Sequence, residues 1–552
     1  MVFRGVALMG FALMTVVAGC AAPQGRESAG TSGAPAAPKR IVAAISGDPR
    51  TVYSSFGANG VRGADVLNIL LNSGLANLDH TATMRPLLAQ EVPSVENGLW
   101  QVFPDGTMDL SWRVRDGAKW HDGTPLTFDD FAFTVQVLQD GELPFPLESA
   151  ALKGLQGVEA VDSRTVRLHW SALNINADRI FAVIGPPLPR HLLENTYQDN
   201  KPNFTDLPYW SSAFIGNGPY KIRDWEPGTL VRLQAFDGYV LGRPKIDEIE
   251  LRYILDPAIM VSNVLAGDID ITLGRNFSPE QAAGVRRQWQ EGRVDVGLLS
   301  SALNIWPQFI DPSPTVLLDV RFKRALFRAL DRETMADVLE GGLTPVAQSW
   351  LLPNLPEYPS LEHYIVKYDY DTRAAAQEIE GIGYTRGPDG MFRDGGGQPL
   401  AVELRTTQLP EINAQTQLTV QNDWQKAGLT VDLNSRPPQS TDPLYTVTYP
   451  GLYLVRYPAD VFTGAGPVQA RVVKNGRYQH PDLDVLMEKF EKTMARSERL
   501  DITGQIIRHM TDQVTVMTLF YDPGTGFVRN RLLNVPPLGD QIPWNAWEWD
   551  VK

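Results

Sequence analysis

The stretch LSWRVRDGAKWHDGTPLTFDDFAFTV, residues 110–135, predicts a strand, a turn and a helix in direct succession. Apolar residues alternate with polar ones at Leu110, Trp112 and Val114, and a Pro-Asp-Gly turn precedes them, which is the pattern of a β-hairpin. Thr127 and Asp130 then form a capping box, in which each side chain accepts from the other residue's backbone amide. We therefore expect a hairpin within residues 100–120 and a short helix after Thr127.

Helices and strands alternate irregularly along the rest of the chain, without an internal repeat, which indicates α/β or α+β domains. Strands are expected at 41–45, 166–170 and 429–433, with a returning strand at 514–521 and a hairpin and strand within 386–406. Helices are expected after Ser278 and at 321–330, 331–341, 371–381, 411–427, 484–494 and 500–510.

The N-terminus has the pattern of an export signal. Arg4 supplies a positive charge, and residues 5–19 are apolar but shorter than a membrane-spanning helix. The stretch VAGC, residues 17–20, holds the only cysteine of the chain and resembles the lipobox of bacterial lipoproteins. This resemblance implies that residues 1–19 are a lipoprotein signal peptide and that Cys20 is lipidated, the alternative being a plain secretory signal with a chance cysteine. Residues 20–38, rich in Ala, Gly, Ser and Pro, are expected to form a flexible tether.

Composition bounds the remaining chain. It is long enough for two to four domains, and the 43% hydrophobic and 21% charged residues of the full sequence indicate a large core rather than disorder. A net charge of −14 argues against nucleic acid as a partner. No later apolar run has transmembrane length, so we expect an anchored protein that does not span the membrane.

Enzyme motifs are missing from the sequence. It has no G-x-S-x-G, no P-loop and no H-E-x-x-H, and its seven histidines show no pair at helical spacing. We therefore expect no catalytic residue, no cofactor and no metal site, although a hydrolase built from distant residues stays open. His121, in a turn, is expected to be exposed or hydrogen-bonded rather than a metal ligand.

Three stretches together resemble the family 5 extracellular solute-binding proteins of ABC transporters, the peptide- and nickel-binding group. The first is residues 110–135, the second contains Gly-Asn-Gly-Pro-Tyr at 216–220, and the third is LDVRFKRALFRALDRETMADVLEGG at 318–342. The chain departs from the third pattern at Lys323, where the family has arginine. Matches to the family patterns also include Gly117, Trp120, Asp122, Gly123, Pro125, Asp319, Arg321, Ala325, Asp331, Arg332 and Gly267–Asp270.

The resemblance implies an α/β fold of the periplasmic-binding-protein type (type II, the large cluster with an extra subdomain), in which a hinge joins two lobes. Lobe 1 is expected at 39–271 plus 511–552, with an inserted subdomain at about 76–180, and lobe 2 at 272–510. The ligand would be held between the lobes.

Peptide-binding members often carry W-x-x-D-[YN] in the second lobe, where the aspartate accepts the ligand's α-ammonium. The corresponding residues here are Tyr453, Arg456 and Tyr457, so the charge is inverted. An arginine suits carboxylate or phosphate, so Arg456 either contacts an acidic group of the ligand or pairs with a protein acid such as Asp460.

Other ligand-binding candidates are aromatic or polar residues in stretches that line the family's pocket. Trp306 and Asn304 stand where the resemblance places pocket-lining residues, and Trp306 either stacks on a ligand or packs in the core. Tyr53 and Trp350 are weaker candidates, and Trp424, on an amphipathic helix, is expected in the core.

The function expected from the resemblance is a lipid-anchored, monomeric solute-binding component outside the cytoplasm. It would deliver a peptide or peptide-like ligand to an ABC permease and its ATPase subunits. The alternatives are an extracellular sensor with the same lobes, a binder of an anionic non-peptide solute, and a secreted hydrolase.

Overall fold

The computed structural model describes residues 37–52, 63–143, 151–274, 277–408, 410–437, 443–458, 477–537 and 543–552. Contacts divide the chain into two units, Met1–Pro38 and Lys39–Lys552, and the elements below belong to the second. Cys20 and Tyr53 lie outside the described residues. No helix in the described ranges combines the length and the apolar composition needed to cross a membrane.

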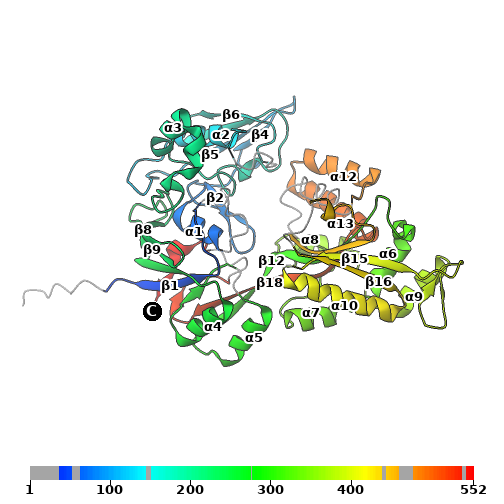
Figure 1. Cartoon of the computed structure of the whole chain (residues 1–552). Coiled ribbons are helices and arrows are strands. Elements are labelled where there is room, and N and C mark those ends of the chain that lie inside the picture. The colour runs from blue at the N-terminus through cyan, green and yellow to red at the C-terminus, as the bar shows by residue number, and fades with distance from the viewer. Residues whose placement is uncertain are drawn as a thin grey trace, which may run out of the picture. The chain divides into compact units, whose positions relative to one another are not determined.

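A mixed sheet of ten strands forms the centre of the second unit, in the order β16-β15-β17-β12-β18-β11-β1-β10-β9-β8 (Figure 1). β12 is antiparallel to its neighbours β17 and β18, whereas β1 is parallel to β10 and β11. The strands predicted at 41–45 and 429–433 are confirmed, and the returning strand begins at Met517. The strands are β1 (Arg40–Ile45), β8 (Tyr220–Glu226), β9 (Leu230–Ala235), β10 (Glu248–Tyr253), β11 (Ile271–Thr272), β12 (Gly292–Pro307), β15 (Ala401–Thr407), β16 (Thr430–Arg436), β17 (Leu452–Pro458) and β18 (Met517–Arg529).

A separate antiparallel sheet contains the predicted hairpin. Its order is β4-β5-β7-β6, and Leu110 and Trp112 of β5 are fully buried, as the alternation predicted. The helix that follows begins at the capping box, because the Thr127 backbone N–H donates to Asp130 Oδ2 at 2.9 Å. These elements are β4 (Trp100–Val102), β5 (Met108–Arg113), β6 (Leu155–Ala160), β7 (Thr165–Trp170) and α2 (Phe128–Leu138), and the two-stranded sheets are β2 (Ala76–Leu78) with β3 (Met84–Pro86), β13 (Thr385–Arg386) with β14 (Phe392–Arg393), and β19 (Leu532–Leu533) with β20 (Asp550–Val551).

Capping residues determine where the other predicted helices begin and end. Ser278 caps α5, Asp331 caps α7 and Asp371 caps α9, each by accepting backbone N–H groups of the first turn. α10 ends at Gly428, which adopts the left-handed conformation. The helices are α1 (Ala64–Leu71), α3 (Arg190–Asp199), α4 (Pro257–Ala266), α5 (Pro279–Gln288), α6 (Val320–Arg328), α7 (Arg332–Glu340), α8 (Tyr358–Leu361), α9 (Thr372–Gly381), α10 (Glu411–Ala427), α12 (Pro481–Lys492) and α13 (Arg496–Asp512).

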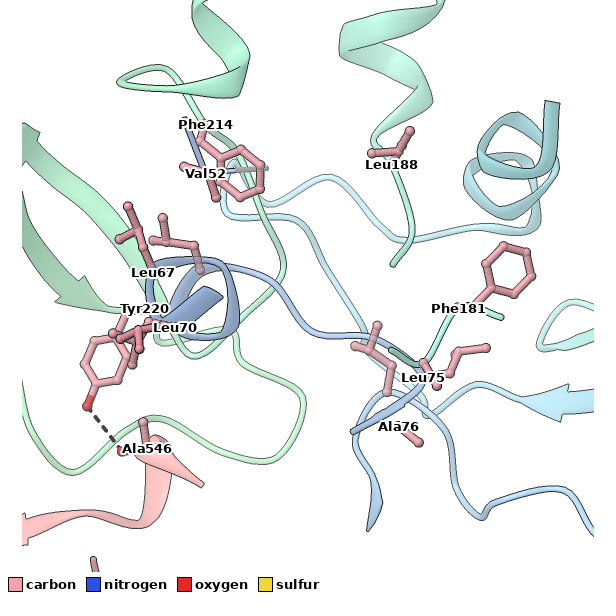
Figure 2. Packing of buried hydrophobic residues seen from close by; sticks show 14 of the residues in the cluster. Val52, Leu67, Leu70, Leu75, Ala76, Phe181, Leu188, Phe214, Tyr220 and Ala546 are labelled. Carbon is pink, nitrogen blue, oxygen red and sulfur yellow. Dashed lines mark hydrogen bonds between the residues drawn. The ribbon is translucent and has the colours of Figure 1, made fainter. Parts of the chain in front are cut away.

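The largest hydrophobic core joins the N-terminal half of the chain to its last residues. Figure 2 shows Leu70 of α1 and Tyr220 of β8 beside Ala546, and the Tyr220 hydroxyl donates to the Ala546 carbonyl oxygen at 3.4 Å. All three residues are fully buried. The C-terminal segment therefore completes a core that residues 41–273 begin.

Two other cores lie around the central strands. One contains Phe322 of α6 and Trp424 of α10; the Trp424 indole N–H donates to the Leu326 carbonyl oxygen at 2.8 Å, so its predicted core position is confirmed. The other packs aromatic residues of β12 and β17 against α12 and α13. β18 contributes to both and, through Phe527, to a fourth core with α4 and α5.

His121 ties the first two sequence motifs together. Its Nδ1 accepts the Gly216 backbone N–H at 3.1 Å, so its Nε2–H donates to the Gly218 carbonyl oxygen, also at 3.1 Å. Burial lowers the pKa of His121 to about 4, so the ring is neutral at neutral pH. Both ring nitrogens form hydrogen bonds with backbone groups, which confirms that this histidine is hydrogen-bonded.

The glycines of the second motif are required by close packing. A Cβ on Gly216 would lie 2.0 Å from the Leu71 carbonyl oxygen, and one on Gly218 would lie 2.5 Å from the Leu71 carbonyl carbon. The Gly218 N–H donates to that same carbonyl oxygen at 3.0 Å. The motif is therefore a scaffold that fixes α1 against the hairpin.

Candidate functional site

Strands β12, β17 and β18 bring together most of the residues predicted to bind a ligand. In the antiparallel pairing of β12 with β17, Trp306 lies opposite Tyr453 and Leu303 lies opposite Arg456. Asn304 pairs with a residue of β18 on its other side. Residues that are far apart in sequence thus share three neighbouring strands at the middle of the sheet.

The predicted aromatic residues pack with one another. Trp306, Trp350 and Tyr453 are all buried in the same core, and the Tyr449 and Tyr453 ring centroids are 5.5 Å apart. Tyr521 of β18 joins them, with its hydroxyl donating to backbone carbonyl oxygens of the segment around Trp350. In this conformation the aromatic side chains form one continuous apolar wall, and they are too buried to stack on a ligand.

Asn304 is a buried polar residue on the same strand as Trp306. Its side-chain amide donates to the Ala302 carbonyl oxygen at 2.9 Å. This bond within β12 occurs where the pairing of β12 with β18 shifts register, between Ala302 and Asn304. The backbone of Tyr457, in β17, pairs with that of Ala302, in β12.

Arg456 forms an ion pair with an acid that the sequence interpretation missed. Its Nη1 lies 3.0 Å from Asp522 Oδ2, and the two side chains are 28% and 13% exposed. The Ser301 hydroxyl donates to the same Asp522 oxygen at 2.9 Å, and the Arg456 backbone N–H donates to the Asn413 side-chain oxygen. The suggested partner Asp460 lies outside the described residues. A signal for Asp522 existed, since it directly follows the predicted returning strand.

A second carboxyl group lies within electrostatic reach of this pair. Glu340, at the end of α7, is buried, and burial together with the charge of Asp522 raises its pKa to about 8, against the opposing effect of Arg456. At neutral pH Glu340 is therefore mostly protonated and adds no negative charge to the Arg456–Asp522 pair. The site offers a fixed dipole, with one cationic and one anionic end.

A cavity of about 640 Å³ opens elsewhere in the second unit. Trp100, Ile175 and Arg179 line one side, and Phe490 and Arg499 of α12 and α13 line the other. Ile175 also packs against the aromatic core that contains Trp306. The cavity thus has both apolar and charged walls and adjoins the core of the candidate site.

Comparison with known proteins gives one family and a consistent set of structural relatives. Residues 84–477, more than half of the chain, match the family model of bacterial extracellular solute-binding proteins, family 5. The oligopeptide-binding protein AppA of Bacillus subtilis is 25% identical over 452 residues, covering 78% of this chain and 76% of that protein.

Solved structures share the fold across nearly the whole chain. The AppA structure in complex with a nonapeptide has a TM-score of 0.68 at 20% identity, covering 94% of this chain and 100% of its own. NikZ from Campylobacter jejuni, in complex with Ni(L-His), has a TM-score of 0.68 at 20% identity, covering 93% and 99%. These matches confirm the α/β fold predicted for this class of binding protein.

Proposed function

The chain belongs to the bacterial extracellular solute-binding proteins of family 5, and we propose that it captures a peptide or peptide-like ligand for an ABC importer. Membership makes it a transport binding protein rather than an enzyme, as the missing motifs predicted. The similarity to a protein named as oligopeptide-binding supports the peptide class. The partners would be an ABC permease and its ATPase subunits, which accept the ligand from the closed protein.

The observation that carries the ligand class is the Arg456–Asp522 pair. Its cationic and anionic ends are both partly exposed and stand 3.0 Å apart beside an apolar wall. A peptide has the complementary set of groups, because its ammonium group suits Asp522 and its carboxylate or backbone carbonyl groups suit the guanidinium of Arg456. A ligand with a single negative charge would instead have to displace Asp522.

We assign the ligand to the region between two lobes, with the boundaries expected from the sequence: residues 39–271 plus 511–552, with an inserted subdomain at about 76–180, and 272–510. Two separate cores support this division, one mainly from residues 41–273 and one mainly from residues 303–454. A further core packs Val264 of α4 against Val285 of α5 across the expected boundary, so α5 goes with the first lobe. β12 and β18 are the long strands that extend through both lobes. Their pairing shifts register between Leu298 and Ala302, which is a suitable place for a hinge.

The binding test uses the chain from Lys39, which contains every described core, unfolded and refolded to remove bound ligand. Thermal midpoints are measured with di-, tri- and oligopeptides, dicarboxylates and metal chelates, because a ligand of the folded state raises the midpoint. Peptides are expected to give the largest rise. A rise with chelates or dicarboxylates alone would contradict the peptide class and favour a non-peptide solute. The fold shared with NikZ, which was solved in complex with Ni(L-His), is the reason to include chelates in the test.

Variants then test the site itself. Arg456→Met and Asp522→Asn are each expected to weaken peptide binding by roughly tenfold or more, since each removes one charged end of the pair. Arg405→Met is the matched control, because Arg405 also forms a partly buried ion pair, with Glu403 at 2.8 Å on the neighbouring strand β15. If Arg456→Met lowers the melting temperature and leaves affinity intact, the pair is structural and the assignment fails.

We also propose that Cys20 is lipidated and holds the protein at the outer side of a membrane. The Val-Ala-Gly-Cys sequence after a short apolar run supports this. The wild-type protein is expected to partition into detergent and to incorporate labelled fatty acid, and Cys20→Ser to do neither. Partition of the wild-type protein into the aqueous phase would refute the anchor. A transport role further predicts that deletion of the cognate permease abolishes ligand uptake, whereas a sensor would not depend on it.

A further inference from the structure

Two helices of the C-terminal region bring three potential metal ligands together. His480 precedes the first residue of α12, Asp482 lies in its first turn, and His509 lies in the last turn of α13. One ligand atom from each side chain lies within 4.8 Å of the other two. Within the ranges that the structure describes, no other group of three such residues meets this condition.

The two helices hold this arrangement through a shared core. α12 and α13 lie side by side (Figure 1), and Met487 and Phe490 of α12 pack with Ile506 of α13 in the aromatic core. The His480 and His509 rings are 4.8 Å apart between centroids, at an angle of 58°. Helix packing therefore sets the position of His509, and it sets the start of α12, where His480 is the capping residue.

Tyr478 orients one of the histidine rings. Its buried side chain packs in the aromatic core, and its hydroxyl lies 2.9 Å from His509 Nε2. Metal-binding histidines commonly have such a hydrogen-bond partner on one ring nitrogen, which fixes the ring while the other nitrogen faces the metal. The other two side chains are free to adjust, since His480 is 39% exposed and Asp482 is 78% exposed.

The distances are suitable for one ion after a small adjustment. His480 Nδ1 lies 3.8 Å from Asp482 Oδ2. Ligand atoms around a tetrahedral ion at about 2.1 Å are roughly 3.4 Å apart, so rotation of the two exposed side chains closes the site. The His480 Nδ1 now accepts the Asp482 backbone N–H at 3.2 Å, a long cap that a metal would replace.

We propose that His480, Asp482 and His509 bind one divalent transition-metal ion of the zinc, cobalt and nickel type. Two imidazoles and one carboxylate are donors that these ions prefer, whereas calcium and magnesium prefer oxygen alone. Three protein ligands leave at least one coordination position open to water or to a further ligand. The site joins the start of α12 to the end of α13 and is independent of the peptide-binding proposal.

The test uses the full chain without an affinity tag, purified in detergent and freed of metal with a chelator. Co²⁺ is titrated and followed by its visible absorption, and Zn²⁺ is then added to displace it. One equivalent of Co²⁺ is expected to bind, with an absorption spectrum typical of low coordination number, and Zn²⁺ is expected to abolish the spectrum because it prefers the same donors.

Variants assign the binding to these side chains. His480→Asn keeps a good helix-capping residue while removing the imidazole, and Asp482→Asn changes only an exposed side chain. Each of these, and His509→Gln, is expected to weaken Co²⁺ binding by roughly tenfold or more. His363→Ala removes an exposed histidine elsewhere and is expected to change nothing.

Three outcomes would overturn the proposal. The first is a wild-type chain that binds no Co²⁺, and the second is binding that His363→Ala weakens as much as His480→Asn does. The third is that both single variants, Asp482→Asn and His480→Asn, bind Co²⁺ with the affinity of the wild type. Circular dichroism shows whether His509→Gln still folds, and the two exposed variants keep the test decisive if it does not.

Discussion

The buried His121 predicts a specific sensitivity of the fold to acid. An unfolded chain titrates this histidine near pH 6.5, whereas burial lowers the folded pKa to about 4. As the pH falls below 6.5, the unfolded chain gains a proton that the folded chain does not take up. The stability that neutral His121 contributes is therefore complete above pH 6.5 and is lost as the pH falls toward 4.

The magnitude follows from these two pKa values. Linkage gives a loss of about 2 kcal/mol in the free energy of unfolding between pH 7.5 and pH 5 from this residue alone. His121→Asn removes the titrating group but keeps one donor and one acceptor. The variant is expected to be less stable than the wild type at pH 7.5, and its further loss on going to pH 5 should be smaller by about 2 kcal/mol.

Urea unfolding followed by tryptophan fluorescence measures this difference at the two pH values. His363→Asn, at an exposed position, should keep the pH dependence of the wild type. Equal losses in the wild type and His121→Asn would refute the reasoning, because they would show that burial does not keep the ring neutral.

Three further predictions concern the capping box, the second glycine motif and the buried carboxyl group of Glu340. Asp130→Ala should cost about 2 kcal/mol or more in urea unfolding, because its carboxylate accepts from the Thr127 and Arg190 backbone amides, whereas Asp129→Ala, at an exposed ion pair, should cost about 1 kcal/mol at most. Gly216→Ala should lower the free energy of unfolding by about 3 kcal/mol or more, since the added Cβ would lie 2.0 Å from a carbonyl oxygen. Gly381→Ala, whose Cβ would contact nothing, should be neutral or stabilising. Similar melting temperatures for the two variants would contradict this prediction. Burial of Glu340 raises its pKa, so its deprotonation should lower the free energy of unfolding by about 3 kcal/mol between pH 4.5 and pH 7. The change in stability over this range should therefore be less favourable by about that amount in the wild type than in Glu340→Gln, and an equal change in the two proteins would contradict the prediction.

Local elements could be predicted because their determinants are adjacent in sequence. A capping residue and the amides that it accepts lie within one helical turn, which is why the beginnings of α5, α7 and α9 followed from Ser278, Asp331 and Asp371. The same holds for the hairpin around the Pro-Asp-Gly turn. The resemblance to the family, through its three motifs, supplied the fold class.

The candidate site could not be assembled in this way, because its contacts join distant segments. Arg456 was identified, but its partner Asp522 comes from a strand whose place in the sheet has no local signal. His480 and His509 show no metal-binding spacing, and only the packing of α12 on α13 brings them together. Burial of Trp306 is likewise a property of the assembled core.

The position of β18 has a consequence for the order in which the protein can fold. This strand follows the other nine strands of the ten-stranded sheet in the sequence, yet it lies between β12 and β11 at the centre of that sheet. Until it is made, β12 and β11 each have an unpaired edge, and unpaired edges of this kind promote aggregation. The central sheet therefore closes only after β18 has been synthesised, and a chain truncated before Met517 would leave two halves of the sheet without their shared strand.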